Sequence, residues 1–175
     1  MFTVSLTIDD AIGAFAGFLS PLLQIEGVPI EIVRGQANKV PPPLGNFCQL
    51  TEMGQFEIET PSVRYDRDNG AAIFYNPCRL AIQVDLYGRR AGDFCRAILL
   101  IFRSEHTVSS LPSWLSPLYC SDGMQAALIN SEMQYQDRWT FTAHFQFSPT
   151  ISVPQSFAET LAINIFENVD TEISY

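Results

Sequence analysis

The chain has 175 residues, which is long enough for a single domain over residues 1–175 with a substantial buried core. Its net charge of −9 and only ten scattered basic residues argue against a nucleic-acid clamp, which needs clustered Lys and Arg against phosphates. Hydrophobic residues make up 47% and charged residues only 17%, so we expect some apolar surface to meet another subunit. A phenylalanine-rich core without a partner is the alternative.

The first predicted element is a helix near the amino terminus. Thr7 suits its N-cap, and Asp9 and Asp10 suit its positive end. Apolar residues recur at helical spacing, at Ile8, Ile12, Phe15 and Leu19. Two short strands are predicted next, from Pro29 to Val33 and from Phe47 to Thr51.

A long hairpin is the clearest signal that follows. Asp68-Asn69-Gly70 separates two β-prone runs, Phe56 to Tyr65 and Ala71 to Tyr87. Asn-Gly accepts the positive φ angles of a type I′ turn, so the chain is predicted to reverse there. Both arms exceed the typical strand of about five or six residues. We therefore expect the hairpin tip to project beyond the domain body.

A second helix is predicted from Ala91 to Ser104, with its apolar residues on one stripe. Glu105 to Ala127 reads as a loop that contains a short strand at Leu118 to Cys120. Met133 to Phe147 is the most regular strand of the chain, because aromatic and polar residues alternate along it, with Asp137 as the exception.

The last elements are a short helical turn beginning at Val153-Pro154 and a strand from Leu161 to Phe166. Strands and helices in this order predict an α+β fold. The expected architecture is an antiparallel or mixed β-sheet with two main helices packed on one face and a long β-hairpin.

A polar loop precedes three prolines between residues 34 and 47. Proline stiffens the backbone, and a stiff polar loop loses little entropy on contact, so we predict that Gly35 to Leu44 lies at a protein interface. An ordinary crossover between strands is the alternative. The candidate interface residues are Arg34, Gln36, Asn38, Lys39, Pro41, Pro42 and Pro43 in this loop, and Arg67, Asp68, Asn69 and Gly70 at the hairpin tip.

Several fragments together resemble the phage neck terminator family. The more specific ones are G-Q-A-N-K-V-P-P-P at residues 35–43 and Q-V-D-L-Y-G-R-R-A-G-D at residues 83–93. Pro117-Leu118-Tyr119 and the stretch from Ile129 to Trp139 follow in the same order, so the likeness covers about residues 28–169. Arg90 departs from the pattern, because a small capping residue is expected before the second helix.

The resemblance implies a structural virion protein of a tailed bacteriophage, located at the neck on top of the tail and made in the host bacterial cytoplasm. It implies a homo-hexameric ring that terminates the tail tube and joins it to the head connector. The implied partners are the tail tube and sheath or connector and collar proteins. The resemblance also implies that DNA passes through the lumen without specific binding, and no membrane and no cofactor are expected. A head-completion or connector adaptor one layer higher is the structural alternative.

Cysteine usage and the apolar segments exclude other classes. Four cysteines show no C-x-x-C spacing, and only two histidines occur, so the pattern disfavours a zinc site and predicts reduced, half-buried core thiols. No signal-peptide pattern is visible, and the longest apolar stretch, about Ala11 to Leu23, is too short for a bilayer.

The rival of a different class is a small hydrolase. Glu57 and Glu59 fall on one side of a predicted strand, about 7 Å apart by strand rise, a separation that fits a glycosidase pair. His144 with Asp85 and Ser131 is the other candidate group. No nucleophile elbow or glycine-rich phosphate loop accompanies them. We therefore predict that the chain is not an enzyme.

Overall fold

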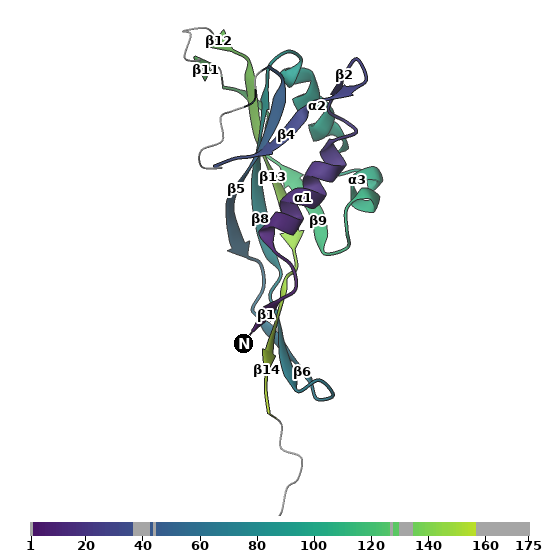
Figure 1. Cartoon of the computed structure of the whole chain (residues 1–175), viewed down its shortest axis with the longest axis vertical. Coiled ribbons are helices and arrows are strands. Elements are labelled where there is room, and N and C mark those ends of the chain that lie inside the picture. Colours follow the sequence, from purple (N-terminus) through teal and green to yellow (C-terminus); the bar gives the residue numbers. More distant parts are fainter. Residues whose placement is uncertain (1, 37–42, 44, 127, 130–134, 157–175) are drawn as a thin grey trace, which may run out of the picture.

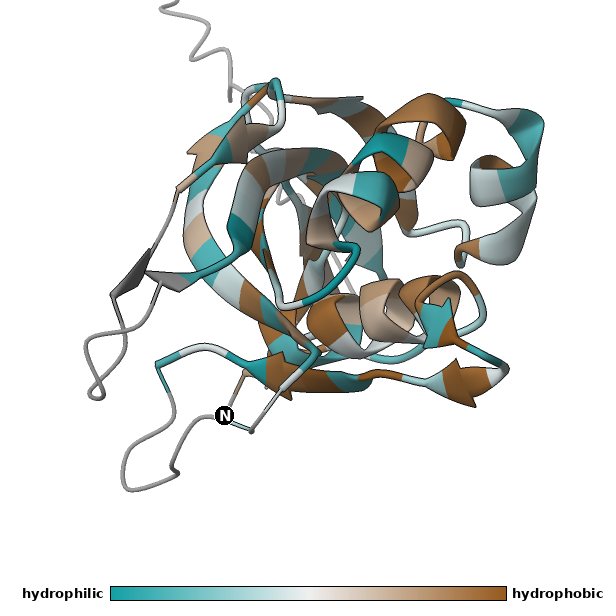
Figure 2. Ribbon diagram, turned by 90° about the horizontal axis from the view of Figure 1, so that it is seen from above, coloured by the Kyte–Doolittle hydropathy of each residue, from teal (hydrophilic) through white to brown (hydrophobic). Residues whose placement is uncertain are grey.

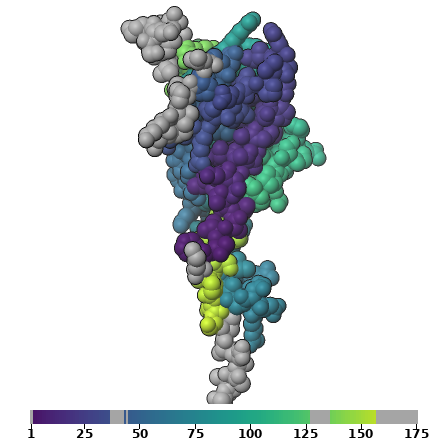
Figure 3. Space-filling model, viewed as in Figure 1, coloured from purple at the N-terminus to yellow at the C-terminus, as the bar shows by residue number. Residues whose placement is uncertain are grey.

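The computed structural model describes residues 2–36, 43, 45–126, 128–129 and 135–156. They form a wide body and a narrow lobe that projects from one end of it (Figure 1). The space-filling view shows the lobe as a thin extension below the body (Figure 3). The body holds the main sheet and the helices, whereas the lobe is a separate small sheet.

The main sheet is mixed. Its strand order is β10-β13-β8-β5-β4, and β9 also pairs with β13. β4 runs parallel to β5, and the other pairs are antiparallel. The strand bounds are Glu31–Arg34 for β4, Phe47–Glu57 for β5, Cys78–Tyr87 for β8, Leu115–Cys120 for β9, Met124–Gln125 for β10 and Arg138–Phe147 for β13.

The helices lie on one face of this sheet, as predicted. α1 spans Ile8–Leu19 and α2 spans Ala91–Ile101, and a short α3 spans Glu105–Ser110. Viewed along the long axis, the helices all lie to one side of the curved sheet (Figure 2). The expected α+β architecture is therefore confirmed for the described residues.

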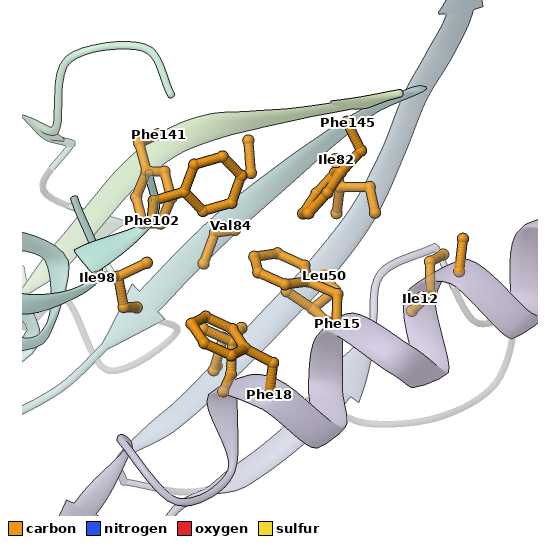
Figure 4. Close-up of a cluster of buried hydrophobic side chains, with 14 of the residues drawn as sticks. Ile12, Phe15, Phe18, Leu50, Ile82, Val84, Ile98, Phe102, Phe141 and Phe145 are labelled. Atoms are coloured by element: carbon orange, nitrogen blue, oxygen red, sulfur yellow. The ribbon is translucent and has the colours of Figure 1, made fainter. Parts of the chain in front are cut away.

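The core fills the space between the helices and the sheet. Phe15 of α1 meets Phe145 of β13 edge to face at 4.8 Å, and Phe102 meets the same ring at 5.2 Å (Figure 4). Alternate residues of the central strands point to this side, because side chains alternate between the faces of a strand. The strand residues of the core include Leu50, Leu80, Ile82, Val84, Leu86, Phe141 and Phe147.

Local signals account for the start of α1 but not of α2. Thr7 and Asp10 form a complete capping box at α1. Before α2, Arg90 has a φ of 69° and makes no side-chain capping hydrogen bond. The Arg90 guanidinium instead pairs with Asp93 at 3.2 Å and lies over the Phe94 ring. α2 therefore begins without the small capping residue that the family resemblance predicts at this position.

The lobe is a four-stranded antiparallel sheet in the order β1-β14-β7-β6. Each arm of the predicted hairpin divides between the two sheets. Phe56–Tyr65 runs from the end of β5 in the body into β6 in the lobe, and Ala71–Tyr87 runs from β7 in the lobe into β8 in the body. The expected projection of the hairpin is confirmed (Figure 1). The lobe strands are Thr3–Val4 for β1, Ser62–Asp66 for β6, Ala71–Tyr75 for β7 and Thr150–Pro154 for β14.

The turn of the hairpin differs from the predicted type I′ turn. Four residues, 67–70, connect the paired Asp66 and Ala71, and Gly70 has a φ of 58° whereas Asn69 has no positive φ. The Asp66 carboxylate accepts hydrogen bonds from the Asn69 amide nitrogen at 3.1 Å and from Asn69 Nδ2 at 2.8 Å. The hydrogen bond from the Asn69 side chain, and then the one from its backbone amide, hold the pKa of Asp66 below its usual value. The Asp66 carboxylate thus stabilises a four-residue connection in place of the predicted Asn-Gly turn.

Three other expectations were wrong. Val153-Pro154 does not begin a helical turn, because β14 pairs with β7 there. The predicted loop from Glu105 to Ala127 contains α3 and a β9 that is longer than expected. The strand predicted from Met133 divides at Asp137 into β12 and β13. The predicted strand from Leu161 to Phe166 lies outside the described residues.

Two small pairs of strands complete the fold. β2 (Gln24–Ile25) pairs with β3 (Val28–Pro29), and β11 (Leu128–Ile129) pairs with β12 (Tyr135–Gln136).

Candidate protein interfaces and the polar sheet face

The helix-free face of the main sheet carries a buried ion pair. Asp85 of β8 is only 1% exposed. Its Oδ1 accepts hydrogen bonds from Arg138 Nε at 3.2 Å and Nη2 at 2.9 Å, and its Oδ2 accepts one from Gln83 Nε2 at 2.8 Å. Both carboxylate oxygens are therefore engaged, which is what a buried charge requires.

The residues of the proposed triad are not brought together. Asp85 is the cross-strand partner of Thr140, four positions along β13 from His144, which corresponds to roughly 13 Å. His144 stacks on Tyr119 at 4.4 Å, and Arg79 Nη1 donates to the Tyr119 hydroxyl at 3.0 Å. Burial, and then the charge of Arg79, lower the pKa of His144. Ser131 lies outside the described residues.

The glutamate pair is also not built as expected. β5 ends at Glu57, so Glu59 lies beyond the strand and the two side chains do not share a strand face. Both residues are exposed. The prediction that Glu57 and Glu59 lie on one side of a strand, at the separation of a glycosidase pair, was therefore wrong.

The cysteines are buried thiols. Cys48, Cys78 and Cys95 are buried, more deeply than predicted, while Cys120 is half-buried, and all four are free. Burial raises the pKa of each thiol, that of Cys120 to about 12, so the reactive thiolate is disfavoured.

Among the described residues, no group of three or more His, Cys, Asp or Glu side chains could hold a metal ion. In the same part of the chain, no helix combines the length and apolar character needed to cross a membrane.

The polar loop leaves the sheet at the end of β4. Arg34 forms an ion pair with Asp9 of α1, within its own chain. The Gly35 amide donates to the Leu50 carbonyl at 2.7 Å, and a Cβ on Gly35 would collide with Thr51 Oγ1. Gln36 is exposed with a φ of 61°, and Pro43 is half-buried. The remaining candidates, Asn38, Lys39, Pro41 and Pro42, lie outside the described residues.

The hairpin tip is far from this loop. Arg67, Asp68 and Asn69 are exposed at the end of the lobe, and Gly70 is half-buried, whereas Arg34 and Gln36 lie on the body (Figure 1). The two groups of candidate interface residues are therefore at separate places on the molecule.

Sequence reasoning missed the apolar face of the lobe sheet. Direct cross-strand partners place Val4, Ile151, Phe74 and Val63 in one row across it. Val153, Ala72 and Tyr65 form the next row on the same side. The other side is mixed, because Ser62, Arg64 and Ser152 lie there together with Ile73 and Tyr75. The period-two alternation of residues 62–65 and 150–153 was a signal that could have revealed it.

A projecting sheet with an exposed apolar face and polar loops at its edges is typical of a subunit that assembles with other proteins. The family model described as phage neck terminator protein matches residues 8–172, so the chain belongs to the phage neck terminator family. Membership makes it a structural protein of the phage tail and places it in the virion with other neck and tail proteins. No curated protein matches the chain.

Proposed function

We propose that this chain, as one terminator domain over residues 1–175, forms a homo-hexameric ring that ends the tail tube and joins it to the head connector at the neck. Family membership over residues 8–172 carries the proposal. The exposed apolar side chains of the lobe support it, because a ring needs subunit contacts. The tail tube and sheath or connector and collar proteins are its partners. The protein is made in the host bacterial cytoplasm and acts without catalysis or a cofactor.

DNA passes through the lumen of this ring without specific binding. The net charge of −9 supports a passage that does not hold phosphates. The two arginines of the helix-free sheet face also have partners within the chain. Arg138 pairs with Asp85, and Arg79 donates a hydrogen bond to the Tyr119 hydroxyl. A ring structure with a lumen lined mainly by Arg and Lys would refute this part of the proposal.

The mass of the assembled particle tests the ring. Native mass spectrometry or light scattering should find particles near six times 19.6 kDa, or monomers that assemble only on tail tubes. Heterologous contacts that close on themselves give such a ring. A stable, compact dimer under all conditions would contradict it.

The candidate interface of the polar loop, Arg34 to Pro43, has its own test. Replacing Gln36 and Asn38 with alanine should weaken assembly by about 1–3 kcal/mol, because buried partner groups lose their hydrogen bonds. The melting temperature of the monomer should change little. Gln24→Ala on β2 is the control, an exposed glutamine away from this loop. A lowered melting temperature with normal assembly would show that the two residues brace their own fold.

A further inference from the structure

Several side chains gather around Arg79 on the helix-free face of the main sheet. Arg79 of β8 lies between its direct cross-strand partners, Gln146 of β13 and Phe56 of β5. The guanidinium carbon of Arg79 lies 4.7 Å from the centre of the Phe56 ring. Arg79 Nη1 donates to the Tyr119 hydroxyl at 3.0 Å, and the Tyr119 ring stacks on His144 at 4.4 Å. We call Phe56, Arg79, Tyr119 and His144 the arginine cluster.

The positive charge of this cluster is not neutralised within the described part of the chain. No carboxylate of the described residues forms an ion pair with Arg79, and Arg79 Nε is buried without a hydrogen-bond partner. The Tyr119 hydroxyl is a neutral acceptor. Burial, and then the charge of Arg79, lower the pKa of His144, so His144 is neutral near pH 7. The cluster therefore carries one uncompensated charge, in contrast to Arg138 on the same face, which is paired with Asp85.

The arginine cluster is held in place but remains partly open to solvent. Arg79 is half-buried, and Phe56 is 46% exposed. The Phe56 ring and the Tyr119 hydroxyl fix the guanidinium, so a partner group loses little of its binding energy to ordering this side chain. Arg and aromatic residues are also enriched at the centres of protein interfaces. The cluster thus has the composition and the order of a protein contact site.

Charge complementarity selects a carboxylate as the group that the cluster binds. A guanidinium pairs with planar anionic groups through parallel N–H···O hydrogen bonds. The net charge of −9 repels the phosphates of nucleic acid, whereas the nineteen acidic residues of every copy supply carboxylates. Glu31, Asp68 and Asp122 are examples that are exposed. A second copy of this chain therefore offers the charge that Arg79 lacks.

We propose that Arg79 of one copy, held by Phe56 and Tyr119, forms an ion pair with a carboxylate of a neighbouring copy. A positive cluster does not complement itself, so the contact joins two different surfaces, which is the heterologous kind that closes into rings. The inference rests on the proposed ring for the arrangement of the copies, whereas the ion pair is testable in any assembly of the chain.

Charge reversal is the first test. Arg79→Glu should raise the protein concentration at half-assembly by at least about tenfold in light scattering, because it places two carboxylates against each other. The matched control is Arg96→Glu, which makes the same change of charge at an exposed arginine of α2 and should assemble as the wild type does. Circular dichroism confirms that both variants are folded. Equal losses in the two variants would overturn the inference, since net charge alone would then decide assembly.

Cross-linking is the second test, and it identifies the copy that supplies the carboxylate. Lys39 is the only lysine of the chain, so Lys39→Arg with Arg79→Lys places the single lysine amine in the cluster. Assemblies of equal amounts of unlabelled and isotopically labelled copies are treated with a carbodiimide, which joins an amine to a carboxylate in contact with it. We expect joined peptides with position 79 from one isotope and an Asp or Glu from the other. Joined peptides of a single isotope only would overturn the inference. Lys39→Arg alone is the control and should give no joined peptide at position 79.

The outcomes separate this inference from the proposed function. Wild-type rings together with Arg79→Glu rings that form at the same concentration would overturn the ion pair and leave the ring intact. If those variant rings no longer join tails, the carboxylate belongs to another virion protein, which also overturns the contact between copies. Dimers or filaments with joined peptides of both isotopes would support the ion pair and contradict the hexamer. A wild type that stays a single chain, in solution and on tails, would overturn both.

Discussion

Arg138→Ala will destabilise the fold by about 3–5 kcal/mol, because it leaves the Asp85 carboxylate buried without its cation. The Asp85 side chain is 2% exposed and that of Arg138 is 25% exposed, so water does little to replace the lost partner. Urea denaturation followed by tryptophan fluorescence measures the change in the free energy of unfolding.

The matched control is Arg90→Ala at the ion pair before α2. The side chains of Arg90 and Asp93 are 52% and 68% exposed, so this pair contributes at most about 1 kcal/mol. A small and equal loss in both variants would contradict the account of Asp85, since it would mean that solvent reaches the carboxylate as easily as at the surface.

Shortening the hairpin will weaken assembly while the body stays folded. Deleting Arg64, Tyr65, Ala72 and Ile73 removes two cross-strand pairs and keeps the alternation of the remaining strands. Burial of one large apolar side chain contributes about 1.5–3 kcal/mol, and each 1.4 kcal/mol is tenfold in affinity. We therefore expect assembly to weaken by about 10- to 100-fold, measured as the protein concentration at half-assembly.

The body supplies the internal control for this deletion. The core residues Phe15, Ile82 and Phe145 lie between the helices and the main sheet (Figure 4). Near-ultraviolet circular dichroism of the shortened protein should match that of the wild type. Complete rings on tails at wild-type concentrations would show that the hairpin is only a loop.

Elements with local signals could be predicted from the sequence. The capping box of Thr7 and Asp10 and the apolar spacing up to Leu19 lie within one helix, so α1 was predicted almost to its bounds. The alternation in β13 likewise predicted its apolar face, where Phe141, Phe145 and Phe147 are buried. In both cases the residues that decide the structure are neighbours along the chain.

Features that depend on distant pairing could not be predicted in this way. β14 is a strand because Ile151 and Val153 pair with Phe74 and Ala72, about 80 positions earlier, and this pairing outweighs the local signal of Val153-Pro154. The buried pair of Asp85 and Arg138 joins residues 53 positions apart. The same holds for the apolar face of the lobe sheet, whose residues come from four separate strands.

The location of the subunit in the particle tests the central claim most directly. Electron microscopy of tails carrying this protein with a label fused to it should show six labelled copies in one ring at the head-proximal end of the tail tube. Label at any other level of the particle, or a number of copies that does not form a closed ring, would contradict the assignment as the neck terminator ring.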